Sequence, residues 1–81
     1  MKTIIFSKTA AKQFDQLPMD AQTRVLDALT LYATIGQGDV TALSARGGYR
    51  LRVGPYRVIF DEILTAIVAV QISRRTTTTY R

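Results

Sequence analysis

Three arginines occupy positions where a β-hairpin would bring their side chains onto one face: Arg50, Arg52 and Arg57. Basic and apolar residues alternate before the turn, so the first two of these arginines point away from the apolar side of their strand. A two-residue turn at Gly54-Pro55 would place Arg52 opposite Arg57 and Arg50 opposite Ile59. Like charges directly opposite each other destabilise a sheet. The pattern therefore predicts that this face binds an anion, most simply a phosphate group.

The distribution of charge along the chain supports the same prediction. Residues 1–45 carry four basic and four acidic side chains, whereas residues 46–81 carry seven arginines and two acids. The whole net charge of +5 therefore lies in the second half, and arginine alone carries it. Arginine binds phosphate through two parallel hydrogen bonds, while lysine serves solubility equally well. A solvated basic surface without a ligand is the plain alternative.

The composition excludes several kinds of chemistry. The sequence contains no cysteine and no histidine, which removes disulfides, thiolate or imidazole metal sites and the commonest general base. We therefore expect no metal and no cofactor. The apolar stretch at the start is too short for a signal peptide, and no run is long enough to span a membrane. These features predict a cytoplasmic protein with a single domain over residues 1–81 and no membrane partner.

The first half of the sequence predicts a strand followed by two helices. Lys2–Phe6 is short and β-branched, and Ser7 offers an N-cap to a helix over Lys8–Leu17. Pro18 separates this helix from a second one, which ends at Gly36. Apolar residues recur at helical spacing in both segments and predict the faces that pack against a sheet: Ala10, Phe14, Leu17, Val25, Leu26, Leu29, Tyr32 and Ala33.

The second half predicts a loop and three strands. Residues 36–48 contain four glycines and are expected to form a loop that Val40 and Leu43 hold to the core. The hairpin follows, with Tyr49 and Tyr56 on its inward face, and the apolar segment Thr65–Ser73 predicts a central strand. The order β-α-α-β-β-β indicates an α+β fold. We expect a two-layer sandwich of a mostly antiparallel sheet with an αα-hairpin on one face, which leaves the arginines exposed.

The predicted last strand extends the basic site. Period-two alternation places Val68, Val70 and Ile72 inward and points the residues between them to the open face. Arg75 continues on the open face and Arg74 does not, although both remain candidates. Tyr80 could fold back over this face and stack on a base, or belong to a free tail. Asp61 shares the open face, where we expect a salt bridge or turn residue, with a catalytic base as the alternative.

The element order, the length and two segments resemble the RelE/ParE superfamily of bacterial type II toxins. The segments are the hairpin of residues 49–60 and the later Ile72-Ser73-Arg74-Arg75 with Tyr80. The resemblance implies a cytoplasmic toxin that a small, partly acidic antitoxin neutralises. RelE-like members cleave mRNA in the ribosomal A site, whereas ParE-like members inhibit DNA gyrase.

The resemblance to the RelE-like branch also implies roles for individual residues. Arg50 and Arg52 match two basic residues before the turn, Arg57 matches an arginine after it, Arg75 one at the end of the last strand, and Tyr80 a tyrosine near the C-terminus. The catalytic set is then Arg57, Arg52, Arg75 and Tyr80, with Arg50 and Arg74 holding substrate.

These roles predict a metal-independent endoribonuclease that inhibits translation. Arg57 and Arg52 would clamp the scissile phosphate, Arg75 would stabilise or protonate the leaving oxygen, and Tyr80 would act as general base. The expected partners are the antitoxin, the ribosome and mRNA. Two alternatives remain open, namely a ParE-like inhibitor of DNA gyrase and a non-catalytic module that binds nucleic acid or protein.

Overall fold

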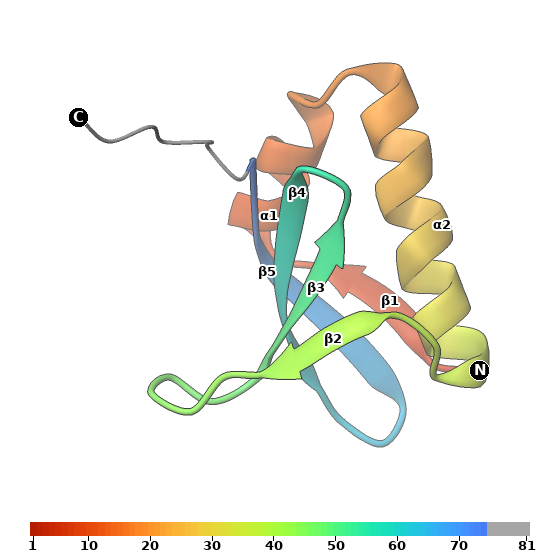
Figure 1. Ribbon diagram of the computed structural model, residues 1–81, viewed down its shortest axis with the longest axis vertical. Helices are drawn as coiled ribbons and strands as arrows, with labels where there is room; N and C mark the ends of the chain where they lie inside the picture. Colours follow the sequence, from red (N-terminus) through yellow and green to blue (C-terminus); the bar gives the residue numbers. More distant parts are fainter. Residues whose placement is uncertain (75–81) are drawn as a thin grey trace.

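Two helices and five strands make up the computed structural model, which describes residues 1–74 (Figure 1). Two predicted site residues, Arg75 and Tyr80, lie outside these described residues. The predicted α+β class is confirmed, and its elements are β1 (Thr3–Phe6), α1 (Lys8–Asp15), α2 (Met19–Ile35), β2 (Asp39–Ala42), β3 (Tyr49–Val53), β4 (Tyr56–Glu62) and β5 (Ala66–Arg74).

Local capping groups set the limits of both helices. Ser7 is extended, and its Oγ accepts a hydrogen bond from the backbone N–H of Ala10, a donor that the first turn of α1 leaves unsatisfied. The predicted helix to Leu17 is two residues too long, because a following proline disfavours helical backbone at that position. Gly36 adopts a φ of +73° and ends α2 by donating its N–H to the carbonyl of Tyr32. Neither helix is long and apolar enough to cross a membrane within the described part of the chain.

The strands form one sheet in the order β1-β5-β4-β3-β2. The outer strand β1 runs parallel to β5, and all other neighbours are antiparallel. The apolar segment predicted as a central strand, which becomes β5, lies inside the sheet between β1 and β4. The mostly antiparallel sheet is therefore confirmed, with β1 and β2 as its two edges.

The segment of residues 36–48 contains a strand where we predicted only a loop. Asp39–Ala42 forms β2, which pairs with the free side of β3. Val40 packs against the core as predicted, and its neighbours on β2 are exposed. The strand was missed because a four-residue segment in which one side chain packs against the core shows too short an alternation to be recognised in a sequence. The strand forms because the backbone donors and acceptors of β3 need partners on their outer side.

The central hairpin has the register that its sequence predicts. Val53 lies opposite Tyr56, Arg52 opposite Arg57, Leu51 opposite Val58, and Arg50 opposite Ile59. Gly54 adopts a φ of +57°, a left-handed conformation that suits glycine and lets the chain reverse in two residues. The turn thus fixes which side chains share a face.

A bulge in β5 overturns part of the predicted alternation. Ile59 pairs with Gln71 and Phe60 with Ala69, so Val70 is an extra residue on β5. Beyond it Ile72 faces inward as predicted, but before it Ala69 is fully buried and Val68 lies on the open face, the reverse of the prediction. An inserted residue shifts the alternation by one, and a period-two pattern does not reveal it.

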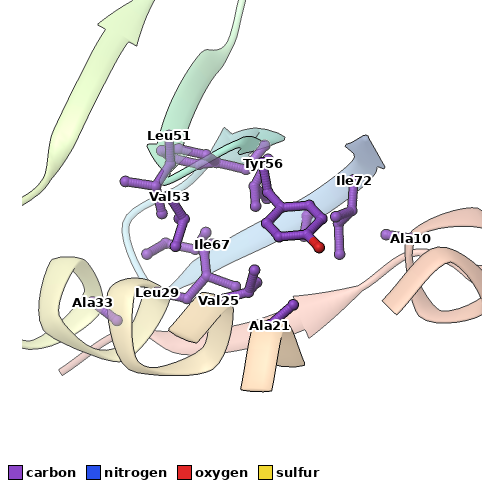
Figure 2. Close-up of a cluster of buried hydrophobic side chains, with 13 residues drawn as sticks. Ala10, Ala21, Val25, Leu29, Ala33, Leu51, Val53, Tyr56, Ile67 and Ile72 are labelled. Atoms are coloured by element: carbon purple, nitrogen blue, oxygen red, sulfur yellow. The ribbon is translucent and has the colours of Figure 1, made fainter. Parts of the chain in front are cut away.

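One core joins the helices to a single face of the sheet (Figure 2). Its helical part is a stripe on α2 together with Ala10 of α1, and its sheet part comes from inward residues of β3, β4 and β5. The larger members are Val25, Leu29, Leu51, Val58, Phe60, Ile67 and Ile72. Leu26 was predicted in the stripe but is 41% exposed, because it is rotated about 100° from Val25 around the helix. Within residues 1–74 no helix covers the opposite face of the sheet, as the two-layer prediction requires.

Candidate functional site

The uncovered face of the sheet carries Arg50, Arg52 and Arg57, and we call it the arginine face. Arg52 on β3 lies directly opposite Arg57 on β4, so the two side chains leave the sheet on the same side. Buried Leu51 and Val58 hold the other side of the same strands in the core. The packing of one face therefore fixes the position of the cations on the other.

A carboxylate that we did not predict as a site residue extends this row. Asp39 on β2 lies opposite Arg52, and its Oδ2 is 4.0 Å from the Nε of that arginine. Both side chains are exposed, so the ion pair contributes about 0–1 kcal/mol. Asp39 offsets only part of the repulsion between Arg52 and Arg57. It was missed because its segment was predicted to be a loop, where no strand register places it beside an arginine.

Arg50 occupies a more enclosed position on the arginine face. It lies between Thr41 on β2 and Ile59 on β4 and is half-buried. Its Nε is shielded from solvent and has no hydrogen-bond partner among the described residues. A buried donor left unpaired costs about 1–3 kcal/mol. The sheet thus holds the Arg50 guanidinium group in place although no described neighbour accepts a hydrogen bond from its buried Nε.

Arg74 lies away from the arginine face. It pairs with Tyr56 on β4, and its Cζ is 5.8 Å from the centre of the Tyr56 ring. Because Tyr56 is buried on the helix side of the sheet, this guanidinium group lies on that side as well, within cation–π distance of the ring. The structure brings Arg50, Arg52 and Arg57 together and separates Arg74 from them.

The opposite end of β4 carries charged groups with partners. Lys2 forms an ion pair with Glu62, and the hydroxyl of Tyr32 donates a hydrogen bond of 2.8 Å to the same carboxylate. The hydrogen bond from Lys2 holds the pKa of Glu62 below its usual value, whereas burial and the bond to Glu62 raise the pKa of Tyr32 to about 12. Asp61 forms a salt bridge of 3.2 Å with Arg46, which confirms its predicted structural role. These groups hold strand ends and loops together.

Comparison with known proteins identifies the fold. No protein-family model and no curated protein matches the sequence. A chain of the archaeal RelE–RelB complex from Pyrococcus horikoshii is similar over 95% of this chain and 98% of its own, with 23% identity and a TM-score of 0.77.

Two further toxin–antitoxin complexes contain similar chains. In the RelB–RelE antitoxin–toxin complex from Methanococcus jannaschii the identity is 19% and the TM-score 0.72, over 88% of this chain and 89% of that one. In the toxin–antitoxin complex RelBE2 from Mycobacterium tuberculosis the identity is 24% and the TM-score 0.63, over 91% of this chain and 98% of that one. The likeness shows a RelE-like fold, as the resemblance of the sequence implied.

Proposed function

We propose that this chain is the toxin of a type II toxin–antitoxin pair and acts as a metal-independent endoribonuclease on mRNA in the ribosome. The observation that carries the proposal is the pairing of Arg52 with Arg57 on an uncovered sheet face. Two guanidinium groups held opposite each other match the non-bridging oxygens of one phosphate. The RelE-like fold supports the proposal because the similar chains come from toxin–antitoxin complexes.

The proposed reaction is attack of a ribose 2′-oxygen on the adjacent phosphorus. The new bond joins the 2′-oxygen to phosphorus, and the bond from phosphorus to the 5′-oxygen breaks, which leaves a 2′,3′-cyclic phosphate and a free 5′-hydroxyl. Negative charge accumulates on the phosphorane oxygens in between. Arg52 and Arg57 would stabilise that charge, and Arg50 would hold a neighbouring phosphate.

The two proton transfers need other groups. Arginine remains protonated in proteins, so the three cations of the arginine face do not accept the proton of the 2′-hydroxyl. We assign this role to Tyr80, and we assign to Arg75 the stabilisation of charge on the leaving 5′-oxygen, which takes its proton from water. Arg74 would hold substrate from the helix side of the sheet, where its guanidinium group lies near Tyr56.

The proposed partner is a small acidic antitoxin. The arginine face is open in the described chain, and β1 and β2 are sheet edges with unpaired backbone groups. An acidic, partly disordered segment would neutralise the charge of the arginine face and pair with the backbone of an edge strand. We propose that the antitoxin binds there and denies mRNA access to Arg52 and Arg57.

The test adds the purified toxin, released from its antitoxin, to two separate assays. In a translation reaction programmed with one mRNA, we expect breaks in phase with codons, each ending in a 2′,3′-cyclic phosphate. In a DNA gyrase supercoiling assay at the same toxin concentration, we expect no inhibition. Inhibited supercoiling with intact mRNA would instead assign the protein to the ParE-like activity.

A further inference from the structure

Arg24 on α2 reaches the turn of the central hairpin. A methyl group built on Gly54 would lie 2.6 Å from the Nη2 of Arg24 and 3.3 Å from its Cζ. The guanidinium group therefore rests against the backbone of the turn, at a distance that only glycine permits. In Figure 1, α2 runs alongside the hairpin of β3 and β4, which allows this contact. Nothing in the sequence pattern connects residues 24 and 54.

The direction of Arg24 is notable because α2 offers it two nearer partners. Asp20 and Asp27 stand four residues before and three residues after it, both spacings at which helical side chains meet. Neither forms an ion pair with it, and among residues 1–74 no acceptor hydrogen-bonds its guanidinium group. The cation thus lies against the turn with no counter-ion from the described part of the chain.

Four guanidinium groups surround the same turn from two sides. Arg52 and Arg57 flank it on the arginine face, whereas Arg24 touches Gly54 and Arg74 lies over Tyr56 on the side of the helices. Of the four, only Arg52 has an ion-pair partner within the described residues, and that pair is 4.0 Å long. Concentrated like charge without counter-ions is unfavourable unless an anion binds there.

We propose that the RNA backbone crosses the turn between β3 and β4 and that Arg24 binds a phosphate on its helix side. The proposal rests on the function proposed above, since it extends the path of the RNA whose scissile phosphate Arg52 and Arg57 hold. Neighbouring nucleotides in one strand carry one phosphate each. In this path Arg50 holds the phosphate on one side of the scissile one, and the strand continues in the other direction across the turn to Arg24.

RNA fits this surface better than an acidic peptide does. Arg24 and Arg74 continue the row of cations from the arginine face around the turn, as a continuous strand of phosphates requires. Guanidinium groups bind phosphate in bidentate fashion and stack on bases, and Arg24 and Arg74 leave both modes available on the exposed side of the turn. Arg24 is accordingly a substrate-binding residue outside the reacting centre.

The experiment measures how salt weakens binding of a single-stranded RNA whose 2′-hydroxyls are methylated, so that it is not cleaved. The Arg24→Gln variant is compared with Arg46→Gln, which changes the charge equally but removes an arginine paired with Asp61 at the other end of β3. We expect Arg24→Gln to lower the slope of log affinity against log salt by about 0.7, the value for one phosphate contact on a single strand. At low salt its affinity should fall about threefold to tenfold. Arg46→Gln should leave the slope unchanged.

Two outcomes contradict the proposal. An unchanged slope in Arg24→Gln overturns it, and weaker antitoxin binding by that variant would then assign Arg24 to the partner protein. Equal losses in both variants would reveal a general charge effect. Arg24→Lys is a second variant that keeps the charge, so it should keep the salt slope of the unsubstituted protein. If mRNA is not cleaved on ribosomes but Arg24→Gln still lowers the slope, the endoribonuclease proposal fails and the RNA contact remains.

Discussion

The two ends of β4 differ in whether their charged side chains form ion pairs within the fold. At its C-terminal end, Lys2 and Glu62 pair with each other, and Asp61 pairs with Arg46. At its N-terminal end, beside the turn, Arg57 lies opposite Arg52, and Asp39 lies on the far side of Arg52. The fold supplies partners to the charges at the first end, whereas at the second end Arg57 has none among the described residues and Arg52 has only the 4.0 Å contact with Asp39.

This difference separates stability from binding within one small sheet. Paired charges fix strand ends and lower the free energy of the folded state, so their removal should lower the free energy of unfolding. Unpaired cations raise the free energy of the folded state slightly, so their removal should weaken ligand binding without lowering stability. The four predictions below test this division: the first three measure stability together with cleavage or RNA binding, and the last measures stability alone.

The largest effect is expected for Arg57→Ala. Loss of a preorganised group that stabilises transition-state charge lowers the rate of mRNA cleavage by about 10²- to 10³-fold. Since the substitution also removes one of two opposed cations, the free energy of unfolding should stay constant or rise by up to about 1 kcal/mol. Cleavage kinetics on ribosomes and urea unfolding of the same preparation provide the measurements. Undiminished cleavage would remove Arg57 from the site.

Glu62→Gln should behave in the opposite way. The carboxylate accepts hydrogen bonds from Lys2 and Tyr32 and is only partly exposed, so we expect a loss of about 1–2 kcal/mol in the free energy of unfolding. RNA affinity should not change. Urea unfolding compared with the exposed-site variant Asp27→Asn provides the control. A large loss of RNA binding without destabilisation would contradict the division between the two ends.

Asp39→Asn should strengthen RNA binding. The substitution removes the single negative charge in the row that contains Arg52 and Arg57, so affinity at low salt should rise about threefold, and the gain should shrink as salt increases. The free energy of unfolding should change by less than about 1 kcal/mol. A weaker complex after Asp39→Asn would show that this carboxylate assists binding.

The smallest effect concerns alkaline pH. The pKa of Tyr32 is raised from 10.0 to about 12 in the folded protein, so its contribution to stability is complete below pH 10 and is lost as the pH rises towards 12. Tyr32→Phe lacks the ionisable hydroxyl and should lose less stability over this interval. Urea unfolding of both proteins at pH 9 and pH 11 measures the difference. Parallel losses in the two proteins would exclude Tyr32 as the source.

Predictions from sequence succeeded where the determining contacts are local. Ser7 and Gly36 act within one helical turn of themselves, and Gly54-Pro55 sets the register of the strands that it joins. For this reason the helices and the hairpin were predicted, including the pairing of Arg52 with Arg57. The segment of β2 was wrongly predicted as a loop, and the inward and outward residues in the first half of β5 were reversed. An edge strand and a bulge depend on neighbouring strands rather than on their own residues.

The residues of the candidate site also fall into those that a local pattern predicted and those that only the tertiary structure revealed. The alternation of arginine and apolar residues was sufficient to place Arg50, Arg52 and Arg57 on one face, since a strand has a fixed period of two and a two-residue turn leaves one register. Only the tertiary structure brought Asp39 beside Arg52, Arg24 against Gly54 and Arg74 over Tyr56. These contacts join segments distant in the chain, and their geometry follows from how α2, β2 and β5 pack around the hairpin, which no local pattern encodes.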